Sequence, residues 1–339
     1  MVAVAAKIYL RDDNLAGSTT MYAGPQGRVA TVTDVVFIDP RHMVVTHLSG
    51  QTMHLLRRGR LRRRWKVVDT TITSVFGDRT RTDLASAHLP SGRIATSNCR
   101  GRSASIYRFS KRRLRHERDI EIQADRPGFT HGVEFTPDGR HLAIVNSNGS
   151  CAVRFYDVET GDEIYAFVEE GLRPKDASFI DHELLVVPMC TGSPTSDPGD
   201  QYSTTIMLYR VDLERGTHET LDAIEVPDAH TDGVFNRDGT VWVADQTNDV
   251  VKVYALDGDR LAFQHDISGI AFPHGIAIDD HQIAVTSYGD ESVNVFDRHA
   301  RRFDAAVSYP APRSRRATRR YRRELRGYRA REAEAEGQS

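Results

Sequence analysis

The chain has 339 residues, of which 39% are hydrophobic and 27% are charged, and this composition excludes a disordered protein. No run of residues reaches the ~20 consecutive apolar positions of a membrane-spanning helix, and no basic segment precedes the short apolar start of the chain, so neither a membrane span nor a signal peptide is predicted. Cys99, Cys151 and Cys190 are too few for a disulfide framework and indicate a reducing, cytoplasmic location.

The net charge of −2 conceals an uneven distribution of charge. Ten arginines and four glutamates follow residue 312, whereas the remainder of the chain has an acidic excess. Tyr309-Pro-Ala-Pro312 is not expected to continue a strand ladder, because proline lacks the N–H group. The sequence therefore predicts an N-terminal segment at 1–30 that could supply a closing strand, a main domain at 31–309 and an Arg-rich C-terminal tail at 310–339.

A pattern of strand, tight turn and strand recurs along the main domain. The clearest copy runs from His131 to Asn146 around the turn Pro137-Asp-Gly139, and further strands follow at 152–157 and 163–168. Other copies begin near residues 34, 83, 176, 230 and 274, and the last one predicts strands at 274–280, 282–287, 292–297 and 303–307. Equivalent first-strand residues are Phe37, His88, Phe135, Phe179, Phe235 and Ile278, separated by 51, 47, 44, 56 and 43 residues.

A repeat of this length with four short strands per unit is typical of β-propeller blades. Between the strands there is no amphipathic stretch long enough for a βα alternation. The predicted fold is therefore all-β, a six-bladed β-propeller with four-stranded blades plus a basic C-terminal extension. A two-sheet sandwich is the alternative, but six copies of one sequence pattern favour blades that repeat around an axis, as in a propeller.

Two of these phrases resemble known propeller repeats. His274-Gly-Ile-Ala-Ile-Asp-Asp280 and Asp232-Gly-Val resemble NHL-type blades, and residues 131–157 resemble the wider superfamily of gluconolactonase-like and strictosidine-synthase-like propellers. The resemblance covers about residues 33–307. It implies a lactonase-like or lyase-like enzyme with a divalent metal on the axis. The lactonases hold that metal through Glu, two Asn and Asp, whereas this chain has His131-Gly132 where they have Asn-Gly.

The inner strands of a propeller begin at the axial channel, so their first residues are expected to meet there. These residues include His131, Lys175, Asp176, His230, Asp232 and His274, which we take as the candidate catalytic set. Imidazole and carboxylate together suit zinc, iron, nickel or manganese, and calcium is also a candidate. His131, His230 and His274 are the predicted metal ligands, with Asp232 or Asp176 bonded to them. Without a metal, a histidine could act as general base beside Lys175 or an aspartate.

A structural interpretation of the same residues stays open. Propeller axes are commonly lined by polar residues and water, and a histidine before glycine can simply bond to the neighbouring blade. His88 is expected to pack between blades. Cys190 is expected in the long loop 189–200, and a nucleophilic role would require a basic neighbour that lowers its pKa.

The sequence thus favours a hydrolase, lyase or isomerase that acts on a small polar metabolite at the axial mouth, with assistance from a metal. One alternative is a non-catalytic scaffold that binds a protein or peptide. Another is a nucleic-acid-associated protein that uses residues 313–331, where Tyr321 and Tyr328 lie among the arginines. That segment is the predicted contact for an anionic partner, or else a solvated extension.

Overall fold

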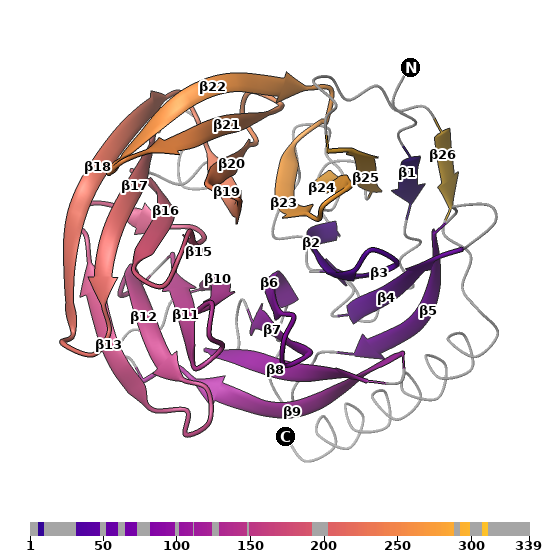
Figure 1. Cartoon of the computed structure of the whole chain (residues 1–339), viewed down its shortest axis with the longest axis horizontal. Coiled ribbons are helices and arrows are strands. Elements are labelled where there is room, and N and C mark those ends of the chain that lie inside the picture. The colour runs from indigo at the N-terminus through magenta and orange to yellow at the C-terminus, as the bar shows by residue number, and fades with distance from the viewer. Residues whose placement is uncertain are drawn as a thin grey trace, which may run out of the picture.

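The computed structural model describes residues 6–9, 32–47, 52–59, 65–72, 82–98, 102–110, 112–123, 129–147, 149–191, 203–287, 292–298 and 307–310. In these ranges the chain forms strands and no helix. Six sheets, antiparallel except for one pair of strands in the last blade, surround a central axis, as Figure 1 shows. The predicted six-bladed β-propeller is confirmed.

Each blade runs from an inner strand at the axis to an outer strand at the rim (Figure 1). Blade 1 comprises β2 (Val32–Asp39), β3 (His42–His47), β4 (Thr52–Arg58) and β5 (Trp65–Ile72). Blade 2 comprises β6 (Thr82–His88), β7 (Arg93–Asn98), β8 (Ser103–Ser110) and β9 (Arg113–Glu121). Blade 3 comprises β10 (Thr130–Phe135), β11 (His141–Asn146), β12 (Ala152–Asp157) and β13 (Glu163–Val168).

The other three blades follow the same order with two variations. In blade 4 the inner strand is divided into β14 (Arg173–Pro174) and β15 (Ser178–Phe179), followed by β16 (Leu184–Cys190), β17 (Ser203–Asp212) and β18 (Thr217–Pro227). Blade 5 comprises β19 (Thr231–Arg237), β20 (Thr240–Asp245), β21 (Val250–Asp257) and β22 (Arg260–Ser268). Blade 6 comprises β23 (Pro273–Ile278), β24 (Gln282–Ser287), β25 (Ser292–Asp297), β1 (Ala6–Tyr9) and β26 (Val307–Pro310).

The last blade is completed by the first strand of the chain. β1 pairs antiparallel with β25, with Ala6 opposite Val295 and Tyr9 opposite Ser292. The fourth position of the blade is thus occupied by β1, and β26 lies one strand further out and runs parallel to it. Residues 303–306 of the fourth strand predicted at 303–307 lie outside the described residues, and residue 307 begins β26. Contrary to expectation, Pro310 belongs to β26. A proline is tolerated there because β26 is an edge strand, where the missing N–H group leaves no neighbouring strand without a hydrogen bond.

The hydrophobic core lies between the blades. One buried cluster joins Phe37 and Trp65 of blade 1 to Ala284 and Val293 of blade 6. The second strands are packed on both faces, so that every residue of β16 is buried. A buried aromatic side chain such as Trp65 contributes roughly 3–5 kcal/mol to such a core. Blade-to-blade packing therefore holds the ring together.

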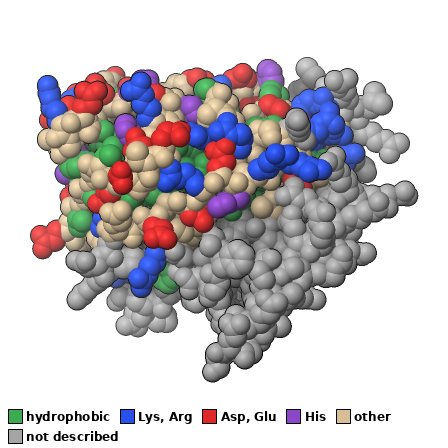
Figure 2. Space-filling model, turned by 90° about the horizontal axis from the view of Figure 1, so that it is seen from below, with side chains coloured by type: hydrophobic (Ala, Val, Ile, Leu, Met, Phe, Trp, Pro, Cys, Tyr) green, Lys and Arg blue, Asp and Glu red, His purple; other side chains and the backbone are tan. Residues whose placement is uncertain are grey.

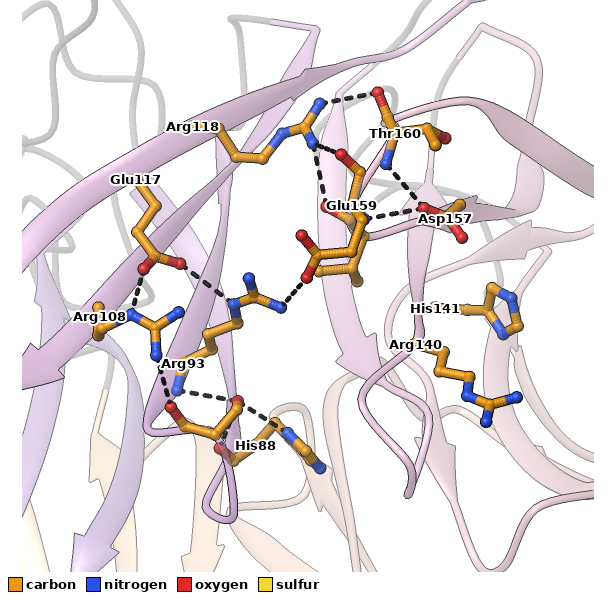
Figure 3. A network of polar contacts seen from close by, with 12 residues as sticks. His88, Arg93, Arg108, Glu117, Arg118, Arg140, His141, Asp157, Glu159 and Thr160 are labelled. Carbon is orange, nitrogen blue, oxygen red and sulfur yellow. Dashed lines mark hydrogen bonds and ion pairs between the residues drawn. The ribbon is translucent and has the colours of Figure 1, made fainter.

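Polar contacts also connect neighbouring blades at the rim (Figure 3). The guanidinium of Arg93 lies 3.1 Å from Glu117 in its own blade and 2.6 Å from Glu159 in blade 3. Arg118 donates to the backbone oxygens of Val158, Glu159 and Thr160. On the side of the molecule that Figure 2 shows, acidic and basic side chains lie interspersed over the described residues. Exposed pairs of this kind contribute at most about 1 kcal/mol each, so they align the blades more than they stabilise them.

His88 packs between blades as predicted. Its ring centroid lies 6.0 Å from that of Phe135 in blade 3. A Cβ on Gly139, which turns with a φ of +69°, would lie 2.4 Å from the same ring. The glycine in this turn therefore leaves room for the histidine.

We expect deletion of residues 1–10 to lower Tm by about 5 °C or more, because β25 would become an unpaired edge. Thermal unfolding followed by circular dichroism measures this effect. Deletion of residues 311–339, which follow β26, is the control and should have a smaller effect. An unchanged Tm after the first deletion would contradict the closing role of β1.

Candidate functional site

The inner strands share one irregularity near the axis. In five blades the inner strand has an extra residue relative to its neighbour, between Val32 and Val35, Thr82 and Ala85, Thr130 and Val133, Thr231 and Val234, and Pro273 and Ile276. In blade 4 the corresponding stretch is the interruption between β14 and β15. Bulges of this kind redirect side chains. His131, Asp232 and His274 lie in the bulges, and Lys175 lies in the interruption.

These redirected side chains meet at the carboxylate of Asp232. Its Oδ1 lies 3.3 Å from Nε2 of His230, 3.4 Å from Nε2 of His131 and 3.5 Å from Nζ of Lys175. Its Oδ2 lies 3.7 Å from Nε2 of His274. The rings of His131 and His274 are stacked, with centroids 6.0 Å apart. Five of the six predicted site residues, from four blades, thus form one cluster, which we call the Asp232 cluster.

Burial and charge set the protonation of the cluster. Burial lowers the pKa of His131 to about 3 and that of His274 to about 4, although the Asp232 carboxylate opposes this shift. Burial alone would raise the pKa of Asp232, but His230, Lys175 and His131 hold it well below its usual value. Burial disfavours the charged form of His230, yet the Asp232 carboxylate outweighs it and raises this pKa to about 9. At neutral pH His131 and His274 are neutral beside an ionised Asp232.

Three of these residues have the arrangement of metal ligands. His131, Asp232 and His274 each place one donor atom within 4.8 Å of the donor atoms of the other two. Among the described residues, these three form the group of His, Cys, Asp and Glu side chains that is close enough to hold a metal ion. The sequence had grouped His230 with the other histidines and placed Asp232 outside. The structure brings Asp232 between His131 and His274, and His230 approaches the same carboxylate.

Cys190 adjoins this cluster. The prediction that it lies in a loop is wrong, because it is the last residue of β16 and fully buried, and residues 192–202 of the loop lie outside the described residues. Its Sγ lies 3.3 Å from Oγ1 of Thr204. Burial raises the pKa of the thiol, but hydrogen bonding to His230 and the charge of that imidazolium lower it to about 7. The basic neighbour that a reactive thiol requires is therefore present.

Next along the axis is a layer of glycines. A Cβ on Gly132 would lie 2.4 Å from Oδ1 of Asp176, and a Cβ on Gly275 would lie 1.9 Å from Oδ1 of Asp34. A Cβ on Gly233 would lie 2.0 Å from the backbone oxygen of residue 274. The glycines after His131, Asp232 and His274 therefore allow neighbouring blades to approach closely.

Asp176 was predicted in the site, but the structure places its carboxylate at the glycine layer. Its Oδ2 accepts a hydrogen bond of 2.9 Å from the backbone N–H of Val234, in the next blade. Asp34 is its counterpart, and its Oδ2 accepts a 2.6 Å bond from the backbone N–H of Ala85. Both carboxyls therefore connect adjacent inner strands.

Beyond the glycine layer the axis contains a cavity of about 280 Å³. Asp34, Glu134 and Asp176 line it, and it extends toward the turns near Pro40 and Asp280. Burial raises the pKa of Asp34 to about 8, that of Glu134 to about 7 and that of Asp176 well above its usual value. Glu134 was not among the site residues predicted from the sequence. The signal was a carboxyl between the apolar residues 133 and 135 of an inner strand.

Comparisons with known proteins identify the fold. No family model and no curated protein matches the chain. A protein from Lactobacillus plantarum is 14% identical, with a TM-score of 0.59, over 88% of this chain and 92% of its own. Hydrazine synthase from Kuenenia stuttgartiensis is 10% identical, with a TM-score of 0.55, over 85% and 99%. The propeller domain of Cps50 (Swd1) from Myceliophteria thermophila is 11% identical, with a TM-score of 0.54, over 80% and 85%.

These structures share the propeller fold with this chain and nothing further follows from them at such identities. Within the described ranges, no helix has the length and apolar character that crossing a membrane requires. Residues 313–331, the predicted contact for an anionic partner, lie outside the described residues.

Gly275→Ala is expected to destabilise the fold by about 3 kcal/mol or more, because the new Cβ would overlap the Asp34 carboxyl and its Cα. Urea unfolding measures the change. Gly171→Ala is the control: it introduces strain at a φ of +77° but meets no atom within 4 Å, so about 1 kcal/mol is expected. Equal losses in the two variants would contradict the close approach at the axis.

Glu134→Gln is expected to reduce the pH dependence of stability. The folded chain keeps this carboxyl protonated up to about pH 7, whereas the unfolded chain releases the proton near 4.5, so the stability that the protonated carboxyl provides is lost as pH rises through this window. Glutamine can form similar hydrogen bonds but does not titrate, so the variant does not lose stability through this group as pH rises. Tm measured from pH 4.5 to pH 7.5, in ~0.5-unit steps, should therefore fall less in the variant. Exposed Glu219→Gln is the control, and parallel curves for all three proteins would contradict the prediction.

Proposed function

We propose that the Asp232 cluster is the active centre of an enzyme that acts on a small polar metabolite, with a divalent metal bound by His131, His274 and Asp232. The observation that carries this proposal is the approach of three donor atoms from three blades to within 4.8 Å of one another. The resemblance of the blades to NHL-type and lactonase-like propellers supports an axial site for hydrolase, lyase or isomerase chemistry.

The donor set suits a metal of the zinc type, because imidazole and carboxylate are both ligands that zinc takes. His131 Nε2 lies 3.4 Å from Oδ1 of Asp232, whereas His274 Nε2 lies 3.7 Å from Oδ2, so each imidazole faces a different oxygen of the carboxylate. The three donor atoms lie within 4.8 Å of one another and would move closer around an ion, because ligand atoms in a tetrahedral site with bonds of about 2.1 Å are about 3.4 Å apart. Because both imidazoles are neutral and Asp232 is ionised near neutral pH, a metal would displace no proton from them.

Each residue of the cluster then has a role. His131, His274 and Asp232 hold the ion, which when bound polarises a carbonyl or phosphoryl oxygen or activates water. Lys175 is a cation 3.5 Å from Asp232 and would stabilise negative charge that develops on a substrate oxygen. His230 is a positioning residue, because its positively charged ring lies 3.3 Å from Oδ1 of Asp232 and holds the carboxylate in place.

A metal-free acid–base site is the second candidate. The contact between Lys175 and Asp232 favours it, because the carboxylate already has a cationic partner there. In that site Lys175 binds the anionic form of the substrate, and substrate binding would have to raise the pKa of His131 from about 3 before this imidazole could accept the proton. Metal content distinguishes the two candidates.

Protein purified without chelators should contain close to one equivalent of zinc, iron, nickel, manganese or calcium by elemental mass spectrometry. The double variant His131→Ala/His274→Ala should lose at least about 90% of it, because one carboxylate oxygen cannot retain the ion alone. His265→Ala, on the exposed outer strand β22, is the control and should keep its metal. Both variants should show similar circular dichroism spectra.

The results separate the candidates. A wild-type protein that takes up no metal, even after loading with zinc, overturns the metal site. Full metal content in the double variant shows that the ion is bound elsewhere. A screen of lactones and phosphate esters then tests whether the metal-loaded protein is an enzyme. If it turns over none of them and retains a stable protein partner, the result favours the alternative of a non-catalytic scaffold that binds a protein.

A further inference from the structure

The outer part of blade 2 contains a row of arginines that lies apart from the Asp232 cluster. Arg108 of β8 lies directly opposite Arg93 of β7 on one side and directly opposite Arg115 of β9 on the other. Residues opposite one another in antiparallel strands point to the same face of the sheet, with Cβ atoms about 5 Å apart. Three guanidinium-bearing side chains therefore lie side by side across three strands, over roughly 10 Å.

The row continues toward the tip of the hairpin that joins β8 and β9. Arg113 lies two positions before Arg115 on β9 and so points to the same face, and Arg112 lies in the turn before it. Arg112 and Arg115 are exposed. We call Arg93, Arg108, Arg112, Arg113 and Arg115 the arginine row.

Few carboxylates compensate the charge of the arginine row. Glu117 contacts the guanidinium groups of both Arg93 and Arg108, so one carboxylate serves two arginines, as Figure 3 shows. Glu159 of blade 3 also contacts Arg93. The ion pairs of the described residues do not include the remaining members of the row, Arg112, Arg113 and Arg115. Five arginines thus share two carboxylates.

Arginines on other blades are compensated differently. Arg210 of blade 4 lies 3.3 Å from Glu219 and 3.0 Å from Asp259. Arg154 of blade 3 donates to both carboxylate oxygens of Glu163. Like charges directly opposite one another destabilise a sheet, so the opposed arginines of blade 2 repel one another in the free protein. An anion bound across the row would relieve this repulsion.

The surroundings of the row favour phosphate groups over an acidic protein as that anion. Protein interfaces bury aromatic or aliphatic anchors at their centre, whereas interfaces with nucleic acids are more polar and strongly positive. The large exposed hydrophobic side chains of the described residues do not belong to β7, β8 or β9, and they are Leu89, Ile164, Val168 and Phe263. A guanidinium also matches the oxygens of a phosphate bidentately.

From this arrangement we propose that the arginine row of blade 2 binds the phosphate backbone of a double-stranded nucleic acid, independently of its sequence. Phosphates follow one another at about 3.4 Å of helix rise along each strand, so a row of roughly 10 Å can contact about three of them. A single strand fits less well, because proteins hold it by stacking its bases on aromatic side chains and the row contains none.

Fluorescence anisotropy of the full chain with a labelled DNA duplex of about 20 base pairs and random sequence tests this proposal. Arg112→Glu/Arg115→Glu should weaken binding at least about tenfold, because it reverses two exposed charges of the row. Arg215→Glu/Arg260→Glu is the matched control. It changes the net charge equally at exposed positions of blades 4 and 5, and it should change Kd by less than about threefold.

The salt dependence of binding gives a second readout. The logarithm of the affinity should fall linearly with the logarithm of the salt concentration, with a slope of roughly −3 for about three phosphates. The slope for Arg112→Glu/Arg115→Glu should be closer to zero by about 2, because two of these contacts are lost. The control variant should keep the slope of the wild type.

Three results would overturn the proposal. The first is a wild-type protein that does not bind the duplex at low salt. The second is an unchanged Kd in Arg112→Glu/Arg115→Glu, which would place binding on another segment such as residues 313–331. The third is equal competition by polyglutamate at the same concentration of charge, which would indicate an acidic protein as the partner. His131→Ala/His274→Ala should bind the duplex like the wild type, so failure of the metal site leaves this test unaffected.

Discussion

The close approach of the inner strands at the axis is the constraint on which the rest of the structure depends. At Gly132, Gly233 and Gly275 there is no space for a Cβ, because a carboxyl or a carbonyl of the next blade occupies it. The carboxyls of Asp34 and Asp176 in turn bond to the backbone of the following blade. The ring is thus drawn together at one level, which separates the Asp232 cluster from the cavity that Asp34, Glu134 and Asp176 line.

The Asp232 cluster and the cavity have opposite electrostatics although both contain aspartates. Asp232 lies among histidines and Lys175, which hold its pKa well below the usual value despite complete burial. Asp34 is equally buried but has neutral donors and other carboxyls as neighbours, and its pKa rises to about 8. The difference arises from the partners, since burial alone would raise both values. The Asp232 carboxylate is therefore ionised at neutral pH, whereas the carboxyl of Asp34 keeps its proton.

Much of this arrangement follows from the repeat in the sequence. Because equivalent residues of successive blades meet at the axis, strand starts alone were enough to bring His131, Asp232 and His274 together. The bulges that aim these side chains leave no pattern in a single strand, so the choice of Asp232 over His230 as the central group could not be read from spacing. Asp176 lies apart from the Asp232 cluster for a related reason, since the inner strand of blade 4 is interrupted between Pro174 and Ser178.

Other features depend on contacts between distant parts of the chain. Local pattern identifies strands, but it does not show which segment completes the last blade, and residues 303–307 had the expected spacing. Cys190 was assigned to a loop because a long polar insertion follows it, whereas its pairing with Thr204 extends β16 to its last residue. Glu134 was overlooked because one carboxyl in an apolar strand is informative only when the neighbouring blades are in place.

The pairing of β1 with β25 also has a consequence for how the chain assembles during synthesis. Ala6 lies opposite Val295, so almost three hundred residues must leave the ribosome before this ladder can form. Five blades can collapse on their neighbours in order while β23, β24 and β25 are still being made. During that time β1 has no partner strand, and it could pair with β25 of a nascent chain on another ribosome. Pairing of β1 with β25 of its own chain thus competes with exchange of β1 between chains, and the exchange increases with the local concentration of nascent chains.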